Sequence, residues 1–239
     1  MFTELKKFAG IHANEDQRNL WLTKILADIP AGKRILDAGA GELRNKPLCL
    51  HLDYVSQDIC QYEGKGDTQG LHMGKWDTSQ IDLVCDIVNV PESNASFDAI
   101  LCSEVLEHLP DTLAALDEFS RLLKPGGKLI LTAPFSSLVH FAPYHYASGF
   151  SRYWYEIHLP ARDLSIIELS SNGDWFDYLK QELFRLPSAA RRYGDWHWPL
   201  AYVLAGMGLV YFAMRRTSKK ADDLACFGWH CVAIKQARA

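Results

Sequence analysis

Three features of other protein classes are missing from this chain of 239 residues. Its net charge is −4, so it lacks the excess of Lys and Arg that attracts phosphate polymers, and we expect no nucleic-acid partner. It has no C-x-x-C pair, and its six cysteines lie scattered, most of them inside apolar runs, as buried thiols do in a reducing compartment. Its first residues do not show the basic and then apolar pattern of a secretory leader. These absences predict a cytoplasmic protein.

Long hydrophobic runs are also absent. The one apolar stretch of note, residues 199–214, has 16 residues without a charge, whereas a helix that spans a bilayer needs about 20. We therefore expect no transmembrane span. A buried helix, or one that forms a homodimer, is the first interpretation of this stretch, and contact with a membrane surface is the second. With 48% hydrophobic and 23% charged residues, the chain has the composition of a globular protein, and its length suits one domain.

The most informative stretch is residues 34–43, where an apolar run leads to Asp37 and then to Gly39 and Gly41. This pattern predicts a buried parallel strand that ends in a glycine turn. Glycine has no Cβ, so the backbone of such a turn can lie directly against a ligand. Asp58 follows about 20 residues after Asp37, the spacing at which a carboxylate binds ribose hydroxyls in nucleotide-binding folds. The stretch therefore predicts a nucleotide-type site.

Apolar runs of strand length alternate with helical patterns along the chain, which predicts a doubly wound, mostly parallel α/β sheet. After the first strand, we expect strands at residues 52–58, 81–87, 96–102, 128–133, 164–169 and 227–234. Helices are expected at residues 2–9, 14–29, 111–123, 155–162, 174–184 and 188–214, the last interrupted around Gly194.

Local signals refine this scheme. Asn14 and Asp111 are predicted to cap their helices, and residues 124–127 to close the helix that Asp111 begins. Pro47 interrupts the region after the glycine turn, so the first crossover is predicted to be short. Residues 64–80 are rich in Gly, Asp, Thr and Lys and are predicted to form a surface loop.

Several motifs in the expected order resemble those of the class I S-adenosylmethionine-dependent methyltransferases, in the broad methyltransferase type 11 grouping. They are ILDAGAG at residues 35–41, Asp58, the pair Asp86 and Ile87, FDAILCSEVLEHLPD at residues 97–111 and LLKPGGKLILTAPF at residues 122–135. The resemblance implies a Rossmann-like seven-stranded sheet with an antiparallel last strand and, here, extra helices between the last two strands. Residues 135–158 also resemble bacterial members from surface-polysaccharide and natural-product pathways.

The resemblance implies one domain with the following parts. Residues 1–33 form a helical cover over the mouth of the site, residues 34–135 the cofactor-binding core, residues 136–163 a substrate loop and helix, residues 164–170 and 226–236 the last strands, and residues 171–225 a helical insertion.

The resemblance also implies how S-adenosylmethionine is held. Asp37 faces the methionine ammonium, while Ala38, Gly39 and Gly41 let the backbone approach the methionine part. Asp58 accepts both ribose hydroxyls, Asp86 takes the adenine amino group, Ile87 packs on the purine ring and Ser103 lies beneath the sulfonium. The chain departs from the family at Leu43, where a third glycine is common, and at Pro47.

A hydroxyl acceptor needs a base, and His108 and His145 are the candidates. A packing or capping role is an equal alternative for His108. Residues 134–154 are rich in His, Tyr and Trp among small residues, which suits an acceptor with apolar faces and hydroxyls. His140, Tyr144, Arg152 and Tyr155 are the predicted substrate contacts. The predicted activity is O-methylation of a sugar, a glycan precursor or another hydroxylated small molecule.

The motifs leave room for a metal ion and for different activities. In ubiquinone-pathway and small-RNA methyltransferases, a similar ExxEH holds a divalent metal ion, so Glu104, Glu107 and His108 could do so here with His140 or His145. Many relatives with this wording bind no metal, and we do not favour one. N- or C-methylation, a catalytically silent cofactor-binding scaffold and an NAD-dependent dehydrogenase are also compatible with parts of the sequence. The dehydrogenase is disfavoured because Arg44 replaces the last glycine of G-x-G-x-x-G.

Overall fold

The computed structural model describes residues 13–62, 64, 67, 70–71, 74–215 and 219–237. The helix predicted at residues 2–9 lies outside these residues. The chain divides into two compact units, one of Leu20–Ser170 with Gly228–Ala239 and one of Met1–Asn19 with Ser171–Phe227. A single domain stays a prediction.

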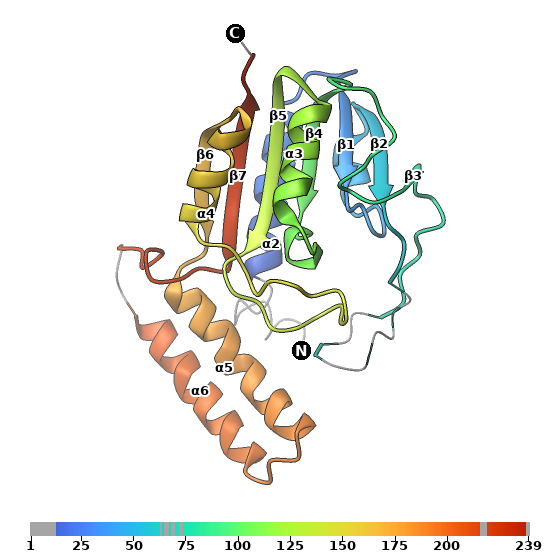
Figure 1. Ribbon diagram of the computed structural model, residues 1–239. Helices are drawn as coiled ribbons and strands as arrows, with labels where there is room; N and C mark the ends of the chain where they lie inside the picture. The colour runs from blue at the N-terminus through green and yellow to red at the C-terminus, as the bar shows by residue number, and fades with distance from the viewer. Residues whose placement is uncertain are drawn as a thin grey trace. The chain divides into compact units, whose positions relative to one another are not determined.

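A seven-stranded sheet organises the described residues, in the order β3-β2-β1-β4-β5-β7-β6 (Figure 1). Its strands are β1 (Arg34–Ala38), β2 (Asp53–Asp58), β3 (Leu83–Val84), β4 (Phe97–Ser103), β5 (Leu123–Pro134), β6 (Leu164–Asn172) and β7 (Gly228–Lys235). The pairs β1–β2, β1–β4, β2–β3 and β4–β5 are parallel, and β7 runs antiparallel to β5. The predicted doubly wound α/β sheet with an antiparallel last strand is confirmed.

Two strands, β3 and β5, differ most from their predicted bounds. β3 has only two residues because Asp82, just before it, uses its carboxylate to accept hydrogen bonds from the Ser56 amide and hydroxyl, at 2.9 and 2.6 Å. β5 begins at Leu123, directly after the preceding helix, so residues 124–127 belong to an irregular start of the strand and do not close the helix as predicted. The predicted short crossover after β1 is confirmed: it contains only η1 (Lys46–Cys49), a 3-10 turn that has Pro47 at its start.

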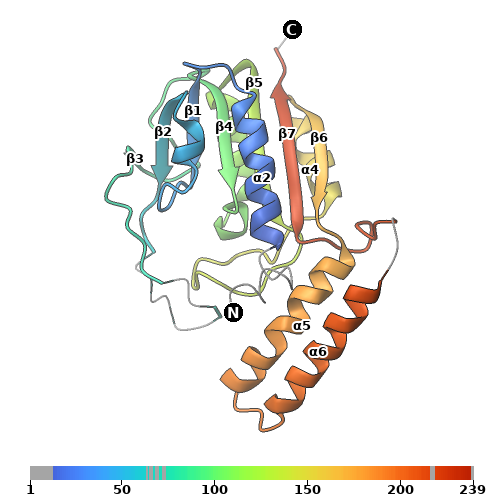
Figure 2. The ribbon, with the colours of Figure 1, turned by 180° about the vertical axis from the view of Figure 1, so that it is seen from behind.

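Helices cover both faces of the sheet. The Leu20–Ala27 part of α2 (Ala13–Ala27) packs Leu22 and Leu26 against Ile35, Leu101 and Ile130. α3 (Thr112–Leu122) and α4 (Arg152–His158) lie on the opposite face, in front of the sheet in Figure 1, while α2 lies in front of it in Figure 2. This part of α2 therefore covers a face of the sheet, whereas the sequence predicted that it covers the mouth of the site.

The two predicted caps have different outcomes. Asp111 caps α3 by accepting hydrogen bonds from the amides of Leu113 and Ala114 at 3.0 and 2.9 Å, which confirms the prediction. Asn14 does not cap α2, which begins one residue earlier. Its side-chain oxygen accepts a hydrogen bond of 2.8 Å from the Asn172 amide group instead.

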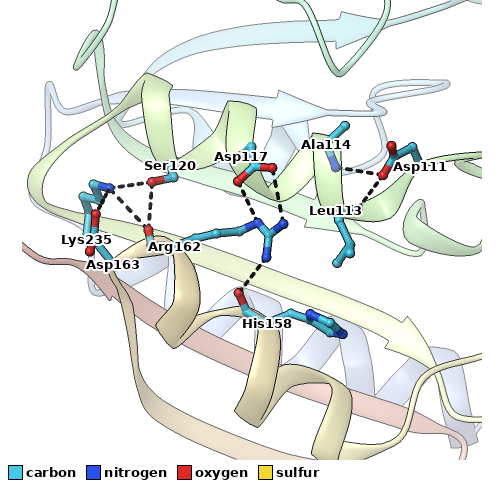
Figure 3. A network of polar contacts seen from close by, with 9 residues as sticks. All are labelled: Asp111, Leu113, Ala114, Asp117, Ser120, His158, Arg162, Asp163 and Lys235. Atoms are coloured by element: carbon cyan, nitrogen blue, oxygen red, sulfur yellow. Dashed lines mark hydrogen bonds and ion pairs between the residues drawn. The ribbon is translucent and has the colours of Figure 1, made fainter.

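A polar network joins α3 to the segment after α4 and to the end of β7 (Figure 3). Arg162, in η3 (Pro160–Arg162), pairs with Asp117 of α3 at 2.8 Å. The buried ammonium of Lys235 donates to the Ser120 hydroxyl and lies 3.5 Å from the Asp163 carboxylate. Because β7 runs antiparallel to β5, its end lies beside the start of β5, at the edge of the sheet opposite to the glycine turn. The network therefore has a structural role.

The second unit contains a helical hairpin of α5 (Trp175–Arg192) and α6 (Trp198–Met214), which lie side by side in both views (Figures 1 and 2). Asp174 begins α5 with a capping box. The predicted break between residues 184 and 188 is wrong, because α5 continues through Pro187. The hydroxyl of Ser188 donates to the Arg185 carbonyl at 2.7 Å. The interruption around Gly194 is confirmed. Among the described residues, no helix is long and apolar enough to cross a bilayer.

Candidate active site

The glycine turn lies at the carboxyl end of β1, where open α/β sheets bind their ligands. Gly39 and Gly41 have φ angles of +77° and +52°, which disfavour residues with side chains. A Cβ on Gly39 would lie 2.5 Å from Val105, and one on Gly41 would lie 2.2 Å from the Trp76 ring. Both glycines are therefore required by backbone angle and by space.

Hydrogen bonds from the end of β2 hold this turn. The Gln57 carbonyl accepts from the amides of Gly39 and Ala40, both at 2.9 Å. The Asp58 carboxylate accepts from the Gly41 amide at 3.0 Å through one oxygen and from the Cys60 amide at 2.8 Å through the other. The predicted ribose carboxylate thus lies directly beside the predicted glycine turn.

Asp37 is buried beneath the turn, with 1% of its surface exposed. Its carboxylate accepts a hydrogen bond of 2.7 Å from the Tyr54 hydroxyl and a longer one from Asn45. Burial raises the pKa of Asp37 to about 6, and the bond from Tyr54 acts in the opposite direction. A cation beside this carboxylate would favour its ionised form, which is what a bound ammonium group would supply.

The remaining predicted cofactor residues lie at neighbouring strand ends. Ala38 is the buried last residue of β1. Asp86 is exposed and accepts a hydrogen bond from the Val88 amide, whereas Ile87 is buried. Gln57 ties this segment to β2 by donating to the Cys85 carbonyl at 2.7 Å.

Ser103, the last residue of β4, is within 2.8 Å of the Thr132 hydroxyl, and that hydroxyl donates to the Glu104 carboxylate at 2.9 Å. Since Thr132 uses its only proton on Glu104, Ser103 is the donor in the first bond. Glu104 is thereby directed toward β5.

Three histidines meet beside this edge of the sheet. The rings of His108 and His140 lie 4.7 Å apart, those of His140 and His145 5.0 Å, and those of His108 and His145 5.9 Å. One nitrogen from each lies within 4.8 Å of the others, an arrangement that could hold a metal ion. The buried carboxylate of Glu107 lies 3.8 Å from His108 Nε2 and 3.9 Å from His140 Nε2. We refer to His108, His140 and His145 as the histidine cluster.

The loop after β5 is bound to η2 (Leu106–His108), and this positions the cluster. His108 Nδ1 lies 2.5 Å from the Tyr144 carbonyl. The Glu107 carbonyl accepts from the amides of Tyr146 and Ala147 at 2.9 and 3.2 Å. Tyr144 therefore contributes its backbone, and its side chain is half-buried.

Two members of the histidine cluster have a lowered pKa, which favours their neutral form. Burial lowers the pKa of His108 to about 4, and the neighbouring histidines lower it further, against the effect of the Tyr144 carbonyl. Burial and His140 also lower the pKa of His145. Neutral imidazoles can accept a proton or bind a metal ion.

Two predicted substrate residues lie elsewhere. Arg152 is exposed on α4 and pairs with Glu156 at 2.6 Å. Tyr155 is completely buried in the core, where the charges of Glu104 and Glu107 add to the effect of burial and raise the pKa of its hydroxyl. Tyr155 is therefore a core side chain and not part of the surface of the loop.

The sequence did not predict an aromatic cluster that lies beside the glycine turn. Trp76 and Tyr62 contact Phe141 with ring centroids 4.8 and 4.6 Å apart, and Phe141 contacts His108 at 5.0 Å. Trp76, Tyr62 and Phe141, here called the aromatic wall, connect the glycine turn with the histidine cluster. A lone Trp within the polar stretch of residues 64–80 was the available signal.

Comparisons with known proteins identify the family of this chain. The model of a family described as Methyltransferase domain matches residues 12–202, so the chain belongs to this family. The ubiquinone biosynthesis O-methyltransferase of Xanthomonas oryzae pv. oryzae is 38% identical over 106 residues, 43% of this chain and 43% of that protein. Its counterpart in Xylella fastidiosa is 35% identical over 114 residues, 46% of each. The match thus spans less than half the length of these relatives.

Among solved structures, the fold is similar to that of phosphoethanolamine N-methyltransferase 2 of Haemonchus contortus, in complex with S-adenosyl-L-methionine. The TM-score is 0.52 at 18% identity, over 95% of this chain and 57% of that one. Family and fold together confirm the predicted class I S-adenosylmethionine-dependent methyltransferase and the cofactor of that class. They leave the dehydrogenase alternative without support.

Proposed function

We propose that this chain transfers the methyl group of S-adenosylmethionine to a hydroxyl of a small, ring-bearing acceptor. The observation that carries the proposal is the continuous arrangement of glycine turn, aromatic wall and histidine cluster. The wall offers flat apolar surfaces for a ring, and the cluster offers neutral imidazoles for a hydroxyl. The names of the curated relatives support oxygen as the methylated atom. Sugars, glycan precursors and hydroxylated aromatics all have this chemistry.

The cofactor residues have defined tasks in this proposal. Asp58 accepts the ribose hydroxyls, and Asp37 faces the ammonium group from its buried position. Asp86 and Ile87 bind the adenine, and the backbone at Ala38, Gly39 and Gly41 contacts the methionine part. Ser103 lies beneath the sulfonium. The cofactor supplies an activated methyl group with a neutral leaving group, so the protein mainly has to align the acceptor and remove its proton.

Without a metal ion in the cluster, His108 is suited to hold that proton. Because a carbonyl only accepts hydrogen bonds, the contact with Tyr144 fixes the proton of the neutral imidazole on Nδ1. Nε2 therefore carries a free lone pair. The same reasoning applies to His140, whose Nδ1 lies 2.9 Å from the Leu138 carbonyl. His145 is the second predicted base.

A divalent metal ion fits this cluster better than the sequence indicated. His108 Nε2 and His140 Nε2 lie 3.8 and 3.9 Å from the same carboxylate oxygen of Glu107, an arrangement of ligand atoms that a cation would stabilise. Neither ring nitrogen of His145 has a hydrogen-bond partner among the described residues. His108, His140, His145 and Glu107 would hold the ion, while Glu104 is directed toward Thr132. Three imidazoles favour Zn²⁺ or Fe²⁺ over Mg²⁺, and the ion would bind and acidify an acceptor hydroxyl.

The experiment is a transfer assay with radiolabelled S-adenosylmethionine and a panel of phenols, catechols, sugars and amines. We expect transfer to hydroxylated acceptors, reduced at least tenfold in Trp76→Ala, with the Trp198→Ala variant as a matched control outside the site. Transfer to amines alone would favour N-methylation. Cofactor binding without transfer to any acceptor would favour the silent scaffold, which would serve a partner protein through residues 199–214. A homodimer through the same residues is a separate proposal.

A further inference from the structure

The α5–α6 hairpin carries an apolar surface that the proposed activity does not use. Along α6, one face is turned to α5: Ala201 and Ala205 are buried, and a Cβ on Gly208 would lie 2.9 Å from Leu183 of α5. The opposite face is exposed over the whole helix. Its large side chains are Leu200, Val203, Leu204, Met207, Val210, Tyr211 and Met214, each at least half exposed.

These exposed side chains form one stripe. Their spacing of three and four residues places them on a single face of the helix. α6 itself contains no charged residue. A contiguous apolar patch of this size on the outside of a protein marks a site that contacts another molecule or a membrane.

The charged residues on both sides of the stripe indicate which kind of partner it contacts. Residues 191–220 contain six Lys and Arg residues and one Asp, in a chain whose net charge is −4. Arg191 and Arg192 precede α6, and Arg215, Arg216, Lys219 and Lys220 follow it. Six of the 25 Lys and Arg residues of this acidic chain therefore flank its most apolar helix in the sequence, and of these Arg215 lies 3.9 Å from the Asp174 carboxylate. Basic residues at the ends of an apolar helix are typical of segments that bind anionic lipids.

Aromatic residues at the tip of the hairpin are also typical of a surface that contacts lipids. Trp196 is 79% exposed and Tyr193 76%. The Arg191 guanidinium lies 5.8 Å from the Trp198 ring and that of Arg192 5.6 Å from the Tyr193 ring. Trp and Tyr are enriched at the boundary between headgroups and hydrocarbon, and Arg side chains extend from there to phosphates. With 17 residues, α6 is about 26 Å long, so it can lie in the interface plane without spanning the bilayer.

We infer that α6 and its basic flanks bind the surface of an anionic lipid bilayer, with the stripe inserted among the acyl chains near the headgroups. This inference rests on the second unit alone and does not depend on the methylated acceptor. A second copy of the chain is the competing occupant, but it would bring the two basic sets together at the interface, which is unfavourable.

The experiment is vesicle flotation of the full chain with phosphatidylcholine alone and with phosphatidylcholine containing phosphatidylglycerol, at low and high salt. We expect at least tenfold stronger binding to the anionic vesicles, weakened by salt. Met207→Glu, at a position 65% exposed, should reduce this binding at least tenfold. Ile157→Glu is the matched control, because Ile157 is also 65% exposed but lies on α4.

Thermal melts verify that both variants fold. Absence of flotation with anionic vesicles would overturn the inference, as would equal loss in both variants. Sedimentation of the same samples gives the other contradicting result: a wild-type dimer that Met207→Glu dissociates, without vesicle binding, would assign the stripe to a second copy.

Discussion

The Gly41 amide donates a hydrogen bond of 3.0 Å to the Asp58 carboxylate, so the turn after β1 and the end of β2 form one structure before any ligand binds. Trp76 lies against the same glycine. The glycine turn, the ribose carboxylate and the aromatic wall therefore depend on one position that has no side chain.

Replacing Gly41 with Ala should damage the site more than the fold. At φ +52° the new Cβ costs about 1–2 kcal/mol and displaces the Trp76 ring, so we expect cofactor affinity to fall at least tenfold. Gly126→Ala is the matched control: its φ is +79°, but nothing lies within 4 Å of a new Cβ. Denaturant unfolding and calorimetric titration measure both effects. Equal cofactor affinity in the two variants would contradict this account of Gly41.

Asp37 should give cofactor binding a dependence on pH. The carboxyl has a pKa of about 6 in the folded protein, against an ordinary value of 3.8. Binding of an ammonium group requires the ionised form, so we expect the dissociation constant to rise up to tenfold per pH unit below about pH 6. Titrations between pH 5 and 8 measure this, and Asp37→Asn should bind weakly with a flat profile. A wild-type profile as flat as that of the variant would refute the assigned role.

The same shift has an opposite effect on the free protein. Because folding raises the pKa of this carboxyl, its contribution to stability is fully present below about pH 4 and is lost as pH rises through about 6. The cost at neutral pH is roughly 3 kcal/mol. Asp37→Asn should therefore melt at a higher temperature than wild type at pH 7.5 while it binds the cofactor less well. Asp53→Asn, at an exposed carboxylate of β2, should change neither.

The histidine cluster should bind one divalent metal ion per chain. We expect His140→Ala to lose the ion measured by elemental analysis, and chelator to abolish methyl transfer in wild type, with S-adenosylmethionine affinity unchanged in both cases. His197→Ala, at a half-exposed histidine of the hairpin tip, is the control and should keep the ion. Transfer that is indifferent to chelator would end the metal proposal and leave His108 as a simple base.

The parts of the fold that the sequence predicted are those set by local backbone requirements. The turn at Gly39 and Gly41, the Asp111 cap and the buried strands follow from glycine conformations, capping preferences and apolar runs, which act within a few residues. Asn14 was misassigned because its side chain bonds Asn172, far along the chain. α5 continues past residue 184 through Pro187, although proline in a helix interior normally ends or kinks the helix.

In the candidate site too, the residues fixed by local sequence were predicted, and those brought together by the tertiary structure were not. Asp58 could be placed by its distance from Asp37 in the sequence, because β1 and β2 are adjacent strands. Trp76 and Phe141 come from separate loops that meet only in three dimensions, so the aromatic wall was not predicted. Tyr155 looked like a member of the aromatic loop, yet helix α4 turns it into the core. The sequence combined His108 with either His140 or His145 as possible metal ligands, and only the fold of the loop over η2 brings all three histidines together.

The most direct test of the central claim is calorimetric titration of the wild-type chain and Asp58→Ala with S-adenosylmethionine and S-adenosylhomocysteine. We expect micromolar binding of both ligands, about −8 kcal/mol. The variant should lose at least tenfold, because the charge-assisted hydrogen bonds to the ribose disappear together with the bond that holds the Gly41 amide. Asp53→Ala is the control and should bind as wild type does. Failure of both ligands to bind the wild-type chain, or binding that is unchanged in Asp58→Ala, would contradict the assigned cofactor site.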